Sequence, residues 1–131
     1  MATLTENSYA GDWLLDYFSA GYCFEQLTVA QQAGQVGDME SGQVLQLESE
    51  GYVECVTGTT ADAILVTSIP EADLQAGDVE ALCLVRGPAV IDEQEIIIAA
   101  AELAGALTAL GALTPPILPA DVNATYDTQT T

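Results

Sequence analysis

Apolar and polar residues alternate most regularly along residues 43–48 (QVLQLE), which is the pattern of a half-buried β-strand. Residues 49–51 (SEG) interrupt this pattern with turn-forming residues, and residues 52–56 (YVECV) resume a strand-like composition. Two such runs joined by a short turn that contains glycine are typical of a β-hairpin. We therefore predict a hairpin over residues 43–56.

Three further runs have the composition of strands: residues 22–31 (YCFEQLTVAQ), 63–69 (AILVTSI) and 79–85 (VEALCLV). The alternation in the first run is imperfect, because Glu25 shares a face with apolar neighbours. Both faces of residues 79–85 are mostly apolar, as expected for a central strand. We expect the chain to continue extended over residues 89–91, after Gly87-Pro88. Residues 95–98 are either a short strand or the entry to a helix.

The clearest long helical pattern covers residues 99–113. Its leucines recur at spacings of 4, 3 and 3, so they form one stripe along the helix. Small residues flank that stripe and suit close packing against a sheet or against another copy of the chain. Thr114-Pro115-Pro116 supplies the stop signal. The leucines are Leu103, Leu107, Leu110 and Leu113, and the small residues are Ala100, Ala106 and Gly111.

The N-terminal segment concentrates aromatic residues. Residues 9–22 carry the only Trp, three of the five Tyr and one of the two Phe. Asp12 can cap a short helix that places Trp13, Leu14, Tyr17 and Phe18 on one side. This segment either packs on the protein's own core or acts as a docking arm whose aromatic residues anchor on a partner. The residues expected to anchor such an arm are Tyr9, Trp13, Leu14, Leu15, Tyr17 and Phe18.

At 131 residues, the length predicts one domain. We divide the chain into an N-terminal arm at residues 1–22, a β-rich domain at residues 23–118 and a polar tail at residues 119–131. The predicted fold class is α+β and β-rich, with one main helix in the C-terminal half and an extended N-terminal arm.

The charge balance excludes some partners. Twenty Asp and Glu stand against a single cation, Arg86, for a formal net charge of −19. Such a chain repels DNA and anionic membranes, so we expect no direct nucleic-acid or membrane partner. High solubility and adaptation to salt both explain an acidic surface. An acidic mimic of DNA that inhibits a nucleic-acid-binding enzyme is the alternative function, but it requires carboxylates gathered on one surface, and here they are scattered.

Residue types needed for most catalysis are missing. The chain has no His, and its three cysteines, Cys23, Cys55 and Cys83, lie in apolar runs without a CxxC pair. We expect buried, inert thiols in a reducing compartment. A single disulfide between two of them is the alternative. Paired carboxylates would suffice for a hydrolase, but twenty scattered acids form many accidental pairs. We therefore predict that the chain is no enzyme and binds no cofactor or metal.

The N-terminus lacks the basic and apolar regions of a signal peptide. The best candidate for a membrane span, residues 96–118, contains Glu102 and Pro115-Pro116 and lacks Lys or Arg flanks. A buried core helix is the better interpretation of that segment. We expect a soluble protein that is made in the cytoplasm.

Several short phrases, in a fixed order, carry a family resemblance. They are GDWLLDY near the start, SGQVLQLESEGYVECV, AILVTSI, LCLVRGPAVID and EIIIAAAELAGALTALGALTPPI. The chain resembles the head decoration proteins of tailed bacteriophages, of the lambda type, over roughly residues 10–118. The matching positions are Gly42–Leu45, Gly51-Tyr52, Ala63–Leu65, Cys83–Gly87 and Leu107–Leu113. The chain departs from the family at Gly51-Tyr52, which lacks an intervening lysine.

The resemblance implies a small domain with a β-tulip-like barrel and no catalysis or cofactor. Three copies would form a homotrimer at local threefold sites on the outer surface of an expanded capsid in the virion. The partner would be the major capsid protein, which the N-terminal arm would bind. The role would be to stabilise the shell against internal DNA pressure. The expected trimer contacts are Arg86, Leu103, Leu107 and Leu110. Arg86 is either a surface residue paired with any nearby acid or a bridge between subunits.

Overall fold

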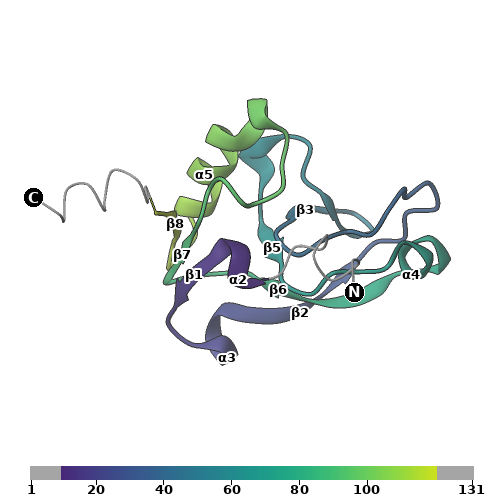
Figure 1. The fold of residues 1–131 in the computed structure, drawn as a ribbon, viewed down its shortest axis with the longest axis horizontal. Coiled ribbons are helices and arrows are strands. Elements are labelled where there is room, and N and C mark those ends of the chain that lie inside the picture. The colour runs from purple at the N-terminus through teal and green to yellow at the C-terminus, as the bar shows by residue number, and fades with distance from the viewer. Residues whose placement is uncertain (1–9, 121–131) are drawn as a thin grey trace, which may run out of the picture.

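The computed structural model describes residues 10–120 (Figure 1). Short helices and strands alternate along this part of the chain, and the longest helix lies near its C-terminal end. In chain order the elements are α2 (Ala10–Trp13), β1 (Leu14–Tyr17), α3 (Ala20–Cys23), β2 (Phe24–Val29), β3 (Val44–Glu48), β4 (Gly51–Glu54), the 3-10 helix η1 (Gly58–Thr60), β5 (Ala63–Leu65), α4 (Glu71–Ala76), β6 (Val79–Leu84), β7 (Ala89–Ile91), the 3-10 helix η2 (Ala100–Glu102), α5 (Leu103–Gly111) and β8 (Ile117–Pro119).

Five strands close into a barrel in the order β2-β4-β3-β5-β6. The β3–β4 hairpin that the alternation predicts is confirmed, with Glu48 opposite Gly51 beside its turn. The longest pairing joins β2 and β6, which are antiparallel from Phe24↔Leu84 to Val29↔Val79. The closure between β2 and β4 is much shorter, since these parallel strands share only the pair Val29↔Tyr52.

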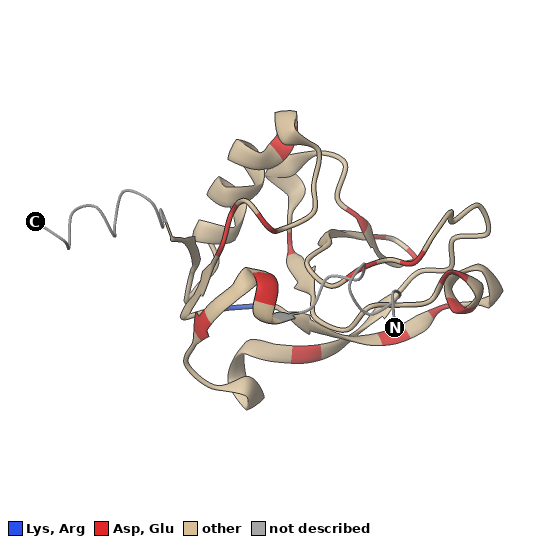
Figure 2. Cartoon of the chain, viewed as in Figure 1, with Lys and Arg blue, Asp and Glu red and all other residues tan. Residues whose placement is uncertain are grey.

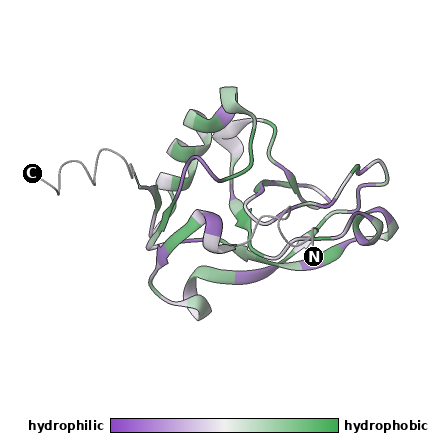
Figure 3. Ribbon diagram, viewed as in Figure 1, coloured by the Kyte–Doolittle hydropathy of each residue, from purple (hydrophilic) through white to green (hydrophobic). Residues whose placement is uncertain are grey.

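A separate three-stranded sheet has the order β1-β7-β8. Its central strand, β7, runs antiparallel to β1 and parallel to β8. In Figure 1 this sheet lies to the left of the barrel, and α5 lies above both. Figure 3 shows α5 coloured mostly as hydrophobic, as expected for a helix that packs on a sheet. The sheet therefore flanks the barrel and shares a helix with it.

Two groups of buried side chains explain this arrangement. The first, which we call the barrel core, comprises Val29, Met39, Leu45, Ala63, Leu65, Ile69, Leu74, Ala81 and Cys83. The second core joins the barrel to the small sheet and α5, and comprises Trp13, Cys23, Val44, Cys55, Ala61, Ile64, Leu84, Ala89, Ile91, Ile96, Ala106, Leu110 and Ile117. Strands β3, β5 and β6 contribute to both cores. Their two faces are apolar for this reason, because successive side chains of a strand point to opposite faces.

The fold class predicted from the sequence, α+β and β-rich with one main helix in the C-terminal half, agrees with the structure. The helical pattern at residues 99–113 forms η2 followed by α5, so its first turn is a 3-10 turn. Residues 95–98 form neither predicted element, and only an isolated bridge joins Ile97 to Gln43. Strand β8 was not predicted, because its three residues follow directly on Pro115-Pro116.

The boundary drawn at residue 22 is wrong for the described part of the arm. Residues 10–22 belong to the folded domain, because β1 pairs with β7 and Trp13 lies in the second core. The predicted helix also ends early: α2 stops at Trp13, and the chain continues as a strand. Tyr9 and residues 121–131 lie outside the described residues. Within residues 10–120, no helix has both the length and the apolar character to cross a membrane.

Candidate protein-docking surface

Trp13 is buried, which corrects its expected role as an exposed anchor. Its indole N–H donates a hydrogen bond of 2.9 Å to Oγ of Ser41, and its carbonyl accepts one of 2.7 Å from the Asp92 N–H. A methyl group added at Gly42, whose φ is +101°, would lie only 3.1 Å from Cδ1 of the indole. The surroundings of Trp13 are therefore built for a buried side chain, and a partner cannot reach it.

The remaining arm residues divide by exposure. Leu14 is partly buried against the second core. Leu15 and Tyr17 are 45% and 43% exposed, and Phe18 reaches 75%. The pairing with β7 shifts register between Leu14 and Asp16, so Leu15 sits at an irregularity in β1. Of the six predicted anchors, Leu15, Tyr17 and Phe18 are thus exposed and available to a partner protein.

Phe18 lies beside a largely apolar groove of about 250 Å³ on the three-stranded sheet. Its backbone N–H donates a hydrogen bond of 3.0 Å to the Pro88 carbonyl, which fixes its position at the end of β1. The ring of Tyr17 packs against Phe24 with 5.0 Å between ring centroids. The groove is lined by Asp16, Tyr17, Phe18, Pro88, Ala89, Val90, Pro116 and Leu118. We call this the Phe18 groove.

Sequence reasoning found only the β1 side of the Phe18 groove. Pro116 and Leu118 join it because β8 pairs in parallel with β7, a contact between segments about thirty residues apart. Leu118 is 48% exposed, which is high for a large apolar side chain on a strand. The only available signal was the apolar Ile117-Leu118 pair between prolines, which fits a loop equally well.

Strand β1 is one of the two edge strands of the small sheet. Strand β1 lies at the end of the order β1-β7-β8, and no strand of the described chain pairs with its outer edge. Exposed edge strands offer unpaired backbone N–H and C=O groups to another chain. The irregularity at Leu15 shortens the regular part of this edge. The Tyr17 N–H, which faces this outer edge, donates a hydrogen bond of 2.9 Å to Oδ1 of Asp16, so the Phe18 groove adjoins only a short stretch of unpaired backbone.

Arg86 is engaged within its own subunit. Its guanidinium donates hydrogen bonds to the Tyr22 carbonyl and to the Glu25 carboxylate, and it lies 5.1 Å from the centre of the Tyr22 ring. The hydrogen bond to Glu25 raises the pKa of Arg86. These contacts join α3, β2 and the end of β6, so they support the interpretation of Arg86 as a surface residue paired with a nearby acid.

The leucine stripe of α5 also faces inward. Leu110 is fully buried, so it cannot contact a second copy, which corrects its place among the trimer contacts. Leu103 and Leu107 are partly buried against the second core. Of the small residues predicted to flank the stripe, Ala106 is buried inside the chain, whereas Ala100 is exposed. A methyl group at Gly58 of η1 would meet the Glu102 carbonyl oxygen at 2.1 Å and the Ala106 nitrogen at 2.7 Å.

The three thiols are free and buried, as the apolar runs predict. Burial raises the pKa of Cys83 to about 12 and also raises the pKa of Cys55. Within residues 10–120, no group of three or more acidic or sulfur side chains is arranged to hold a metal ion. Acidic residues are spread over helices, strands and loops of the described chain (Figure 2).

The described surface thus offers an apolar groove with an adjacent free strand edge, which is a geometry for binding protein. Comparison of the chain with protein-family models, with curated proteins and with solved structures finds no match.

Proposed function

We propose that this chain is a structural protein of a phage virion: a head decoration protein that binds the major capsid protein. In this proposal it forms a homotrimer at local threefold sites of the expanded capsid and stabilises the shell. The support comes from the ordered motifs over residues 10–118 and from a domain that combines a small closed barrel with one main helix. The Phe18 groove supplies a surface suited to the capsid partner.

Phe18 is the observation that carries this proposal. It exposes 75% of its surface although its backbone is fixed by the Pro88 carbonyl. A residue whose backbone is already fixed loses less conformational freedom when it binds, and aromatic residues dominate interface hot spots. Burial of a phenylalanine side chain contributes roughly 1.5–3 kcal/mol. The capsid protein would place apolar side chains in the groove and pair a strand with the free edge of β1.

The charge of the chain constrains the capsid side of the contact. Asp16 lies at the groove, and the whole chain carries −19 with Arg86 as its only cation. An acidic capsid rim would therefore repel the decoration protein, whereas a basic rim would attract it. We propose a basic rim around an apolar contact on the capsid protein. Added salt should then slow association while the apolar contact persists.

The test is decoration of expanded capsids of the same phage by the native protein and by Phe18→Ser. We expect the variant to bind about tenfold or more weakly, because a hot-spot aromatic contact is lost. Leu47→Ser is the matched control, since Leu47 is 57% exposed but lies on β3 of the barrel, away from the groove. Melting temperatures establish that both variants remain folded.

Equal decoration by Phe18→Ser, Leu47→Ser and the native protein would remove the Phe18 groove as the capsid contact. Failure of the native protein to bind expanded capsids at all would overturn the proposed function itself. A native mass measurement of the free and capsid-derived protein tests the trimer separately.

A further inference from the structure

The barrel has an incomplete seam between β2 and β4. After the single pair Val29↔Tyr52, the chain leaves β2 and turns toward α4. The Gln31 N–H donates to Oδ1 of Asp78 at 2.8 Å, and the Gln32 N–H donates to the Leu74 carbonyl at 3.0 Å. These bonds hold the departing chain away from β4, so the seam stays open beyond Tyr52.

The open seam exposes the backbone of Glu54. The Ala30 N–H donates to the Tyr52 carbonyl at 2.9 Å, which places the hydrogen-bonding groups of Tyr52 on the β2 side of β4. The Cys55 N–H donates to the Val44 carbonyl at 2.9 Å, so the hydrogen-bonding groups of Cys55 face β3. Because these groups alternate along a strand, the N–H and C=O of Glu54 face the β2 side. No described residue pairs with them there.

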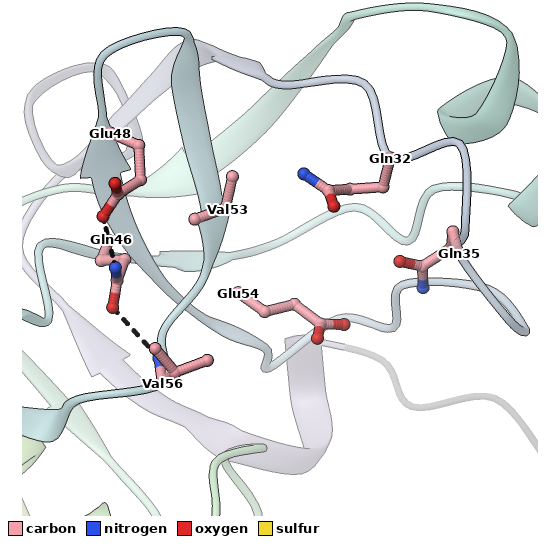
Figure 4. Close-up of a pocket in the computed structure, with 7 residues that line it drawn as sticks. All are labelled: Gln32, Gln35, Gln46, Glu48, Val53, Glu54 and Val56. Carbon is pink, nitrogen blue, oxygen red and sulfur yellow. Dashed lines mark hydrogen bonds between the residues drawn. The ribbon is translucent and has the colours of Figure 1, made fainter.

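A hollow of about 500 Å³ occupies the place where β2 would have continued. Figure 4 shows Glu54 reaching from β4 toward Gln35, with Gln32 on the same far side. Apolar side chains from β4 and the segment after it share the lining with polar ones. The lining residues are Gln32, Gln35, Gln46, Glu48, Val53, Glu54 and Val56.

Gln46 stiffens the floor of this hollow. It is 8% exposed, donates to Oε2 of Glu48 at 2.5 Å and accepts from the Val56 N–H and the Thr60 hydroxyl, each at 3.0 Å. Glu48 is thereby held at the wall, whereas the exposed Glu54 carboxylate has no hydrogen-bond partner among the described residues. Glu48 and Glu54 therefore border the hollow from opposite faces of the β3–β4 hairpin, because Glu54 is paired with Leu45 and side chains alternate along a strand. Neither carboxylate forms an ion pair with a described residue.

We propose that this seam is a second docking site, which binds an extended segment of a partner protein that carries lysine or arginine. The segment lies beside β4, in the position that β2 would occupy if its pairing continued beyond Val29. The backbone of the segment pairs with the backbone of Glu54. Its basic side chain lies beside the exposed Glu54 carboxylate, where the side-chain amides of Gln32 and Gln35 add acceptors. Charge selects this occupant, because an acidic segment would meet two carboxylates on a chain of net charge −19. The site goes beyond the proposed function and shares no lining residue with the Phe18 groove.

The test is a titration of the full chain with a short blocked peptide of alternating lysine and valine, followed by amide NMR. We expect shifts at Gln32, Gln35, Val53 and Glu54, and slower exchange of the Glu54 amide in the complex. Glu54→Gln should weaken binding about tenfold, because a charge-assisted contact is lost. Glu93→Gln is the matched control, since it removes the same charge from a loop outside the seam.

The same peptide with glutamate in place of lysine should not bind, and a peptide N-methylated at alternate residues should bind weakly if the strand edge is used. Equal weakening by Glu54→Gln and Glu93→Gln would show general charge attraction and overturn the site. Absence of binding at millimolar peptide, or a Glu54 amide already protected in the free protein, would overturn it too. No capsid is used, so the result is independent of the proposed function.

Discussion

The indole of Trp13 and the hydroxyl of Ser41 form a buried hydrogen bond that ties the N-terminal segment to the loop before β3. This bond changes how the arm must be tested. Deletion of residues 1–18 would remove Trp13 and β1 together, so a loss of capsid binding would reflect damage to the second core as well as loss of the docking surface. Point substitution at Phe18 separates the two.

We predict that Ser41→Ala lowers the free energy of unfolding by about 1–3 kcal/mol, because it leaves the indole N–H buried without its acceptor. Ser49→Ala, in the exposed β3–β4 turn, should change it little. Urea unfolding measures both. In a double-mutant cycle with Trp13→Phe, a coupling near zero would contradict a stabilising role for this bond.

Close approach of η1 to the main helix gives a second prediction. A Cβ at Gly58 would meet backbone atoms of Glu102 and Ala106 that cannot move without shifting the helix. Gly58→Ala should therefore destabilise the protein by about 3 kcal/mol or more. Gly34→Ala is the control, because a Cβ there meets nothing within 4 Å, and its effect should stay below about 1 kcal/mol. Similar melting temperatures for the two variants would contradict the tight contact.

Burial of Cys83 predicts a loss of stability at alkaline pH. The thiol has a pKa of about 12 in the folded protein, against 9.0 when unperturbed, so the unfolded chain releases this proton first. The contribution is fully present below pH 9.0 and is lost as pH rises toward 12, by at most about 4 kcal/mol. The raised pKa values of Cys55 and Tyr52 act in the same direction.

Cys83→Ala should flatten this alkaline decline, as measured by denaturant unfolding across the pH range. Native Cys83 should also resist alkylation until the chain unfolds, because only the thiolate reacts. Rapid alkylation of Cys83 in the folded protein at neutral pH would contradict its assigned burial.

The contacts of Arg86 within its own chain predict that Arg86→Ala leaves the proposed trimer intact. The substitution removes the ion pair with Glu25 and the contact with the Tyr22 ring, so a small fall in melting temperature is expected. Native mass spectrometry at a fixed protein concentration measures the oligomer. Conversion of a native trimer to monomer by this substitution would instead support a bridge between subunits.

Local patterns in the sequence predict the parts of the fold that local interactions determine. The hairpin at residues 43–56 follows from alternation around a glycine turn, and the two-faced apolar strand at residues 79–85 becomes β6 between the two cores. Strand β1 was mistaken for a helix, because Trp13, Leu14, Tyr17 and Phe18 also fit a helical spacing. The segment forms a strand because it pairs with β7, which lies more than seventy residues away in the sequence.

The same limit applies to the candidate sites. Phe18 was among the predicted anchors, but the rest of its groove depends on β7 and β8, which adjoin only in the folded chain. The open seam at Glu54 was not anticipated, because it arises where β2 and β4 fail to continue their pairing. Absent pairing between distant segments leaves no pattern in a sequence.

Strands β3, β5 and β6 present side chains to both cores, so neither core can lose its packing while the other keeps its strands. The barrel and the small sheet should therefore melt as one cooperative unit, although the β-sheet is divided into two parts. Fluorescence of the single tryptophan, Trp13, follows the second core, and far-ultraviolet circular dichroism follows the strands as a whole. The two signals should share one unfolding midpoint, and a substitution that destabilises either core should shift the midpoint of both signals.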